Sequence, residues 1–260
     1  MVCFRWSCFA LVFGLSATIS AQNPLLDSAK TPVRADSGPA DSTTALTPEK
    51  RADILMARKM YREAIEVYRE APQESAITWN KIGIAYHQLM QLDSAKKHYE
   101  QAIKVNPKYA EAINNLGTVH YAKKNYRRAI GQYRKALKLN PNSASIYSNL
   151  GTAEFARKKY KECFEAYEHA LALDPEVFEH RSSYGVLLQE RSVQEKAKYH
   201  YYLARIYAKS GNNERALLYL RKALEEGLKE RDKLMEDSEF AGMRELPEFK
   251  ELVTAEPRVL

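Results

Sequence analysis

The hydrophobic and small positions of this chain repeat with a fixed period from residue 46 onward. Glycine, tyrosine, alanine and proline each return every 34 residues, with polar residues at helical spacing between them. A period of this length indicates a stack of repeated structural units rather than a single layered domain. The aligned columns are Gly83, Gly117, Gly151 and Gly185; Tyr99, Tyr133 and Tyr167; Ala95, Ala129 and Cys163; Ala102, Ala136 and Ala170; Ile82, Leu116 and Leu150; Pro107, Pro141 and Pro175.

Each column has a physical reason if every unit is a pair of helices. The glycine lies on the first helix and the Ala95 column on the second, where small side chains let the two helices approach closely. Large residues such as Trp79 and Tyr99 fill the space beside them. The proline ends the second helix, because it lacks an N–H and clashes with the preceding turn. Asp93 and Asn125 precede the second helices and suit the N-cap position.

With these columns in place, residues 76–109, 110–143 and 144–177 resemble tetratricopeptide repeats. The resemblance is carried by TWNKIGIAYHQLMQLDSAKKHYEQAIKVNP, AINNLGTVHYAKKNYRRAIGQYRKALKLNP and SIYSNLGTAEFARKKYKECFEAYEHALALDP. It implies an all-α fold, a right-handed superhelical solenoid of antiparallel helix pairs. It also implies that the first helices line a concave side on which proteins or peptides bind.

The segments on either side of these repeats depart from the pattern. Residues 46–75 are predicted to form a degenerate N-terminal repeat, 178–196 an irregular helical insert, 197–228 a degenerate repeat and 229–260 capping helices. Residues 197–210 fit two frames, as the second helix after Gly185 or as the first helix before Gly211. The capping tail is expected because a repeat array otherwise exposes an apolar end.

The N-terminal 45 residues are predicted to lie outside the fold. Residues 1–21 have the order of a secretory signal, with Arg5 before the apolar run 9–19 and a small-residue cleavage site near Ala21. An uncleaved anchor is the alternative, although the run is shorter than the roughly 20 residues that span a bilayer. Residues 22–45 are rich in Ser, Thr, Pro and Asp and are predicted to be a disordered linker. We therefore expect an exported protein, periplasmic or at the cell surface, and not a transmembrane protein. The capping tail resembles the closing segment of many bacterial repeat proteins, which implies a bacterial origin.

No pattern in the chain indicates catalysis. Phosphate-binding glycine loops, nucleophile elbows and histidine–carboxylate metal spacings are absent from the sequence, so no enzyme activity, cofactor or metal is expected. Cys3 and Cys8 lie in the signal segment, which leaves Cys163 without a disulfide partner. Its place in the Ala95 column favours a buried small residue over a reactive thiol.

Helical spacing predicts which side chains of the first helices face the concave side. Their mixture of amides, hydroxyls and aromatic rings suits an extended peptide, although ordinary polar surface is the alternative for each one. The cations with which some relatives clamp a carboxylate are missing, since only Asn115 fits that pattern. The predicted peptide-binding groove consists of Asn80, Ile84, His87, Gln88, Asn114, Thr118, Tyr121, Ser148, Thr152 and Phe155.

A second candidate surface is basic. The sequence has no acidic residue between Ala112 and Thr152, and its cations fall on the turn and the outer face of one second helix. Such a surface attracts an acidic protein or an anionic envelope component, or it is a solvated face. Nucleic acid is not expected, since no aromatic residues interleave with the cations for base stacking. The basic surface consists of Lys123, Lys124, Arg127, Arg128, Arg134, Lys135 and Lys138.

The sequence therefore predicts a non-catalytic scaffold or adaptor of the cell envelope that binds a partner peptide or helix in its groove. The alternative is a structural subunit that self-associates, or packs in an envelope assembly, through the insert and the capping tail.

Overall fold

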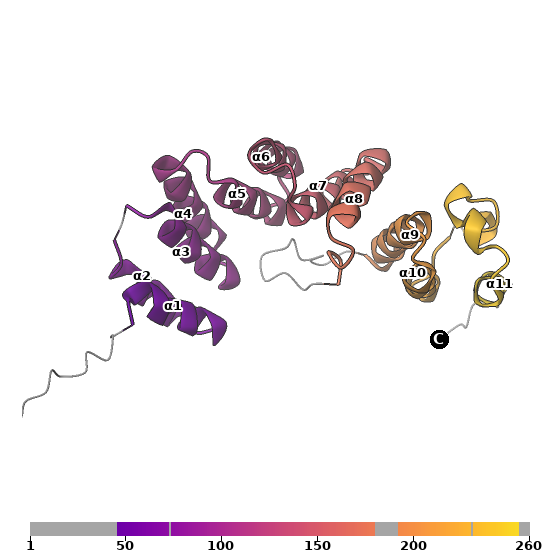
Figure 1. Cartoon of the computed structure of the whole chain (residues 1–260), viewed down its shortest axis with the longest axis horizontal. Helices are drawn as coiled ribbons and strands as arrows, with labels where there is room; N and C mark the ends of the chain where they lie inside the picture. The colour runs from indigo at the N-terminus through magenta and orange to yellow at the C-terminus, as the bar shows by residue number, and fades with distance from the viewer. Residues whose placement is uncertain (1–45, 73, 180–191, 230, 255–260) are drawn as a thin grey trace, which may run out of the picture. The chain divides into compact units, whose positions relative to one another are not determined.

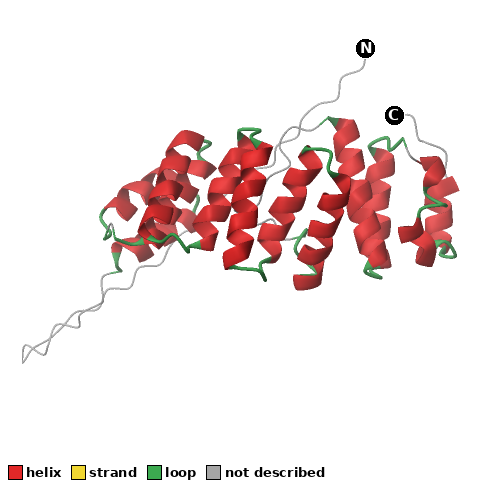
Figure 2. Ribbon diagram, turned by 90° about the horizontal axis from the view of Figure 1, so that it is seen from above, coloured by secondary structure: helices red, strands yellow, loops and turns green. Residues whose placement is uncertain are grey.

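The structure is a computed structural model that describes residues 46–72, 74–179, 192–229 and 231–254. The predicted signal peptide and linker, and most of the predicted insert with Gly185, lie outside these residues. Within them every regular element is a helix, and Figure 2 shows helices joined by loops, with no strand in the described part. The prediction of an all-helical fold is confirmed.

Eight helices form four consecutive hairpins in the order of the chain (Figure 1). Each first helix packs along its second helix, and each second helix contacts the first helix of the next hairpin. The connections are short, so neighbouring helices run antiparallel. The helices are α1 (Pro48–Ala57) and α2 (Tyr61–Arg69); α3 (Ala76–Gln88) and α4 (Leu92–Val105); α5 (Ala110–Ala122) and α6 (Tyr126–Leu139); α7 (Ala144–Ala156) and α8 (Tyr160–Leu173).

The glycine and tyrosine columns meet inside each of the three full repeats, as the sequence predicts. A Cβ on Gly117 would lie 2.6 Å from Cε1 of Tyr133, and one on Gly83 would lie 2.6 Å from the ring of Tyr99. The tyrosine rings are almost completely buried. Cys163 is also fully buried, which confirms its reading as a small packing residue. The glycines therefore create the space that the tyrosines fill.

This packing predicts different effects of substitution at two glycines, Gly117 on α5 and Gly131 on α6. We expect Gly117→Val to lower the free energy of unfolding by about 2–3 kcal/mol, because the new side chain overfills the Tyr133 contact. Gly131 on α6 has nothing within 4 Å of a Cβ, so Gly131→Val is expected to change stability by less than about 0.5 kcal/mol. Urea titration of both variants measures the difference, and equal losses would contradict this account.

The turn inside each hairpin is closed by one residue in the left-handed conformation. Met90, Lys124 and Lys158 have φ of 58°, 59° and 61°. The next residue donates its N–H back into the first helix, as Gln91 does to the Tyr86 carbonyl at 2.9 Å. This is the hydrogen-bond pattern of a Schellman motif, which satisfies carbonyls at the helix end. The sequence did not reveal these positions, because none of them is glycine.

The predicted N-caps are only partly correct. Asn125 does occupy the N-cap of α6, but its side chain makes no capping hydrogen bond. Asp93 is not a cap, because α4 begins one residue earlier with Gln91 at its N-cap. Asp93 instead accepts a hydrogen bond from Lys123, which holds the pKa of the Asp93 carboxyl below its usual value.

A further hairpin follows the insert. Helix α9 (Val193–Lys209) packs along α10 (Asn213–Glu225), and Gly211 closes their turn with a φ of 79°. Asn212 donates its N–H to the Tyr207 carbonyl at 2.9 Å, as Gln91 does in the earlier turn. In the structure, α9 is therefore the first helix of a hairpin with α10.

Helices α8 and α9, which follow each other among the described helices, run in the same direction. Tyr160 stacks on Tyr202 with ring centroids 5.2 Å apart. One turn further along both helices, Arg205 lies 5.3 Å from the Phe164 ring. A second turn along, Glu168 pairs with Lys209 at 2.5 Å. The contacts advance in the same direction on both helices, so α8 and α9 run parallel.

The C-terminal tail packs on the last hairpin. It comprises η1 (Arg231–Lys233), η2 (Ser238–Met243) and α11 (Pro247–Thr254). Phe240 and Phe249 are fully buried in the same apolar cluster as residues of α9 and α10. Arg205 of α9 adds ion pairs to Asp237 at 3.1 Å and Glu239 at 2.8 Å.

Candidate binding surfaces

Buried amides connect three successive first helices. Asn149 of α7 donates to Oδ1 of Asn114 at 3.0 Å, and Asn115 of α5 donates to Oδ1 of Asn80 at 3.0 Å. Asn114 closes the gap by donating to Asn115 at 3.3 Å, and Asn80 donates to Glu111 at 3.2 Å. We call Asn80, Asn114, Asn115 and Asn149 the amide chain. All four are at most 6% exposed, so their hydrogen bonds to one another replace those to water.

The amide chain accounts for much of the predicted groove. Asn80 and Asn114 belong to it. Thr118 donates to the Asn115 carbonyl at 2.7 Å, and Thr152 donates to the Ser148 carbonyl at 2.9 Å. Ile84, Tyr121 and Phe155 are also buried, whereas His87 and Ser148 remain partly exposed. Burial lowers the pKa of His87, which favours its neutral form. The structure thus brings these residues to one side of the stack but gives most of them intramolecular partners.

A cavity of about 370 Å³ opens at the N-terminal end of the first-helix side. Ile84 and Gln88 of α3 line it, together with Met56 and Ala57 of α1 and Tyr61 of α2. Its polar edge is an ion pair between Lys81 and Asp53 at 2.7 Å. Of the predicted groove, Ile84 and Gln88 are the residues that line this N-terminal cavity. An apolar floor with a few polar groups at the edge suits a side chain of a bound peptide.

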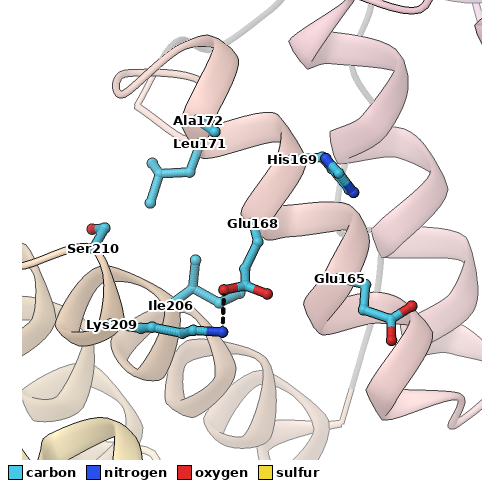
Figure 3. Close-up of a pocket in the computed structure, with 8 residues that line it drawn as sticks. All are labelled: Glu165, Glu168, His169, Leu171, Ala172, Ile206, Lys209 and Ser210. Carbon is cyan, nitrogen blue, oxygen red and sulfur yellow. Dashed lines mark ion pairs between the residues drawn. The ribbon is translucent and has the colours of Figure 1, made fainter.

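A second cavity, of about 440 Å³, lies between the parallel helices α8 and α9 (Figure 3). Its floor is apolar, with Leu171 and Ala172 from α8 and Ile206 from α9. Glu168 and Lys209 face each other across it, and Glu165 and His169 project from α8. The sequence did not predict this inter-helix cavity, because it depends on the parallel packing of α8 and α9.

The predicted basic surface is exposed on α6 and the turn before it. All of its residues except Lys123 are exposed. Two of the seven have acidic partners: Lys123 pairs with Asp93, and Arg134 pairs with Glu154 at 2.9 Å. Within the described residues, Lys124, Arg127, Arg128, Lys135 and Lys138 form no ion pair. The surface therefore carries positive charge that the rest of the stack does not balance.

Two further kinds of site are absent from the described residues. No group of three or more His, Cys, Asp or Glu side chains is arranged to hold a metal ion there. None of the helices there combines the length and the apolar character that crossing a bilayer requires.

Stacked hairpins of two helices that repeat every 34 residues, with a glycine–tyrosine contact inside each full repeat, define a class of helical repeat proteins. Sequence models of the tetratricopeptide repeat match residues 74–142, 114–178 and 201–234. Together these matches cover more than half of the 260 residues. The chain belongs to the tetratricopeptide repeat family.

Similar curated proteins match over short segments only. The chloroplastic tetratricopeptide repeat domain-containing protein PYG7 of Arabidopsis thaliana is 32% identical over 74 residues, 28% of this chain and 25% of that protein. The small glutamine-rich tetratricopeptide repeat-containing protein 2 of Mycosarcoma maydis is 30% identical over 97 residues, 35% of this chain and 28% of that protein. The match therefore spans between a quarter and a third of these relatives' length.

Solved structures resemble the chain over a larger share. MamA (41-end) from Desulfovibrio magneticus RS-1 is 20% identical, with a TM-score of 0.48, over 68% of this chain and 92% of that one. YrrB, described as a TPR protein with an unusual peptide-binding site, is 20% identical with a TM-score of 0.45, over 69% and 84%. At these values the likeness carries no argument about function.

Proposed function

We propose that this chain is a non-catalytic scaffold or adaptor that holds a peptide or helix of a partner protein along its first-helix side. The N-terminal cavity is the observation that supports this most directly. It combines an apolar floor at Met56 and Ile84 with the Lys81–Asp53 pair and the exposed amide of Gln88. One large side chain of a partner fits such a site, while its backbone reaches the polar edge.

The remaining groove residues have a different part in this proposal. The amide chain, Thr118 and Thr152 already form hydrogen bonds within the stack. In this proposal the amide chain fixes the spacing of the first helices. His87 and Ser148 are partly exposed and continue the path from the cavity along α3 and α7. The partner is thus expected to be anchored near α1 and α3 and to be contacted more sparsely beyond them.

The compartment in this proposal is the cell envelope, with the chain in the periplasm or at the cell surface. The apolar run and small-residue site in residues 1–21 support it. Cell fractionation tests the compartment, and recovery of the chain with cytoplasmic proteins would contradict it.

Blocking the N-terminal cavity tests the proposed site. Ala57 is exposed and lines the cavity, so Ala57→Trp fills it without disturbing the core. A photoreactive residue at Gln88 is expected to capture a partner in intact cells, and Ala57→Trp is expected to reduce this capture about tenfold or more, equivalent to a loss of about 1.4 kcal/mol. Ala241 is exposed on η2, outside the cavity lining, which makes Ala241→Trp the matched control. Equal capture by both variants would exclude the cavity as the anchor.

A self-associating structural subunit is the second candidate function. In the described part of the tail, Phe240, Met243 and Phe249 are buried against α9 and α10, so they are not available to a partner. The observation that favours self-association is instead the opposite charge of two neighbouring outer helix faces.

A further inference from the structure

The outer face of α6 is basic, whereas the outer face of α8 carries two glutamates, Glu165 and Glu168, and one cation, Lys161. A shift of 34 residues places Glu165 where α6 has Gly131, Glu168 where it has Arg134, and His169 where it has Lys135. The α6 face also bears Arg127 and Lys138, and α6 contains no acidic residue. Because the repeat positions are the same, these residues lie on corresponding outer faces of two successive hairpins.

Most of these charges are not neutralised within the stack, although Arg134 pairs with Glu154 at 2.9 Å. Lys135 and Lys138 are exposed and have no ion pair within the described residues, and the same is true of Glu165. Glu168 does pair with Lys209, but it remains about one third exposed at the cavity edge. Two faces of opposite sign are thus open to charged groups outside the chain.

The α8 face is shaped to receive a long basic side chain. Glu165 and Glu168 stand at the mouth of the inter-helix cavity, above the apolar floor at Leu171 and Ile206 (Figure 3). Lysine and arginine place their aliphatic stems on apolar surface while the charged head stays at a polar edge. The C-terminal ends of the parallel helices α8 and α9 both lie at this cavity. The C-terminal end of a helix favours cations.

The α6 face permits close approach. Gly131 is exposed in the middle of α6, and nothing lies within 4 Å of where its Cβ would be. Glycine within a helix costs about 1 kcal/mol relative to alanine, and no contact in the described chain requires it there. A bare backbone at this point lets another helix lie closely against α6.

We propose that these two faces bind each other in a symmetric dimer, with α6 of each copy packed against α8 of its partner. A two-fold axis brings the same patch together from both copies, so one chain that carries both charges is complementary to itself. Lys135 and Lys138 of one copy enter the inter-helix cavity of the other, beside Glu165 and Glu168. This dimer uses the second helices and leaves the first-helix side open, so it does not depend on the proposed peptide site.

Analytical ultracentrifugation of the full chain tests the dimer. The wild-type chain is expected to dimerise at low salt and to dissociate at about 1 M salt, where the screening length falls to about 3 Å. Two variants reverse one face each: Lys135→Glu with Lys138→Glu, and Glu165→Lys with Glu168→Lys. Each variant alone places like charges together and is expected to be monomeric. Mixed with each other, they are expected to form a heterodimer, because both contacts then join opposite charges.

Lys97→Glu with Lys104→Glu is the matched control, since these exposed residues of α4 occupy the repeat positions of Gly131 and Lys138. This control variant is expected to dimerise like the wild type. A wild-type chain that stays monomeric overturns the proposal, as does a mixture of reversed variants that fails to associate. A monomer that binds poly-glutamate through Lys135 and Lys138 would assign the α6 face to a different, acidic protein.

Discussion

Tyr167→Ala is expected to lower the free energy of unfolding by about 3–5 kcal/mol, the range for removing a large aromatic ring from a core. Tyr167 is fully buried and fills the space left by Gly151. Its ring also packs edge-on against Phe178, with centroids 5.0 Å apart, and against Tyr199 of α9 at 6.1 Å. It therefore joins the third full repeat to the hairpin beyond the insert.

The expected loss of stability depends on how deeply the tyrosine is buried, so a less buried tyrosine serves as the control. Tyr147 is only partly buried and stacks on the exposed His169 at 5.1 Å. Tyr147→Ala is expected to cost less than about 1.5 kcal/mol. Urea titration followed by circular dichroism measures both variants. If both variants lost a similar amount of unfolding free energy, the buried tyrosine of the repeat would not be the residue that determines stability.

Phe240→Ala is expected to have an effect of similar size, about 3–5 kcal/mol, at the other end of the stack. Phe240 is fully buried, and its ring lies 5.5 Å from Phe249 and 6.2 Å from Tyr201 of α9. Removing it leaves a cavity between the tail and the last hairpin. The Arg205 ion pairs remain in this variant, but they do not fill the space of the missing ring.

The tail offers its own control in Met235, which is 43% exposed. Met235→Ala is expected to change stability by less than about 0.5 kcal/mol. Limited proteolysis gives a second readout, since Phe240→Ala is expected to expose the segment after η1 to cleavage while α3 to α8 stay protected. A Phe240→Ala chain as stable and as resistant as Met235→Ala would mean that the tail does not cap the stack.

The parts of the fold that depend on periodicity were predictable from the sequence. The glycine, alanine and tyrosine columns indicate which faces meet, and the structure buries Tyr99, Tyr133 and Tyr167 against their glycines. Periodicity left two frames open for residues 197–210, and only the frame with a second helix after Gly185 makes this helix parallel to α8. The parallel packing of α8 and α9 depends on contacts such as Tyr160 with Tyr202, which lie outside any aligned column. The inter-helix cavity follows from this parallel packing and was therefore not predicted.

The candidate groove shows a different limit of sequence analysis. Helical spacing assigned Asn80 and Asn114 to one side of the stack, but it did not indicate what they would contact. Their partners Asn115 and Asn149 are offset by 35 residues, one more than the repeat. An alignment at the repeat period therefore puts each amide in a different column from its partner. The basic surface on α6 could be predicted without knowing any side-chain contact, because surface charge on one helix follows directly from its sequence.

The amide chain also governs how the stack responds to a pulling force. If one hairpin moved along its neighbour by a helical turn, about 5.4 Å, the amides of Asn80, Asn114 and Asn149 would leave their partners while still shielded from water. Each stranded amide costs about 1–3 kcal/mol, with no new partner at intermediate displacements. Gradual sliding is thus opposed from the first ångström, so under tension whole hairpins should detach in discrete steps.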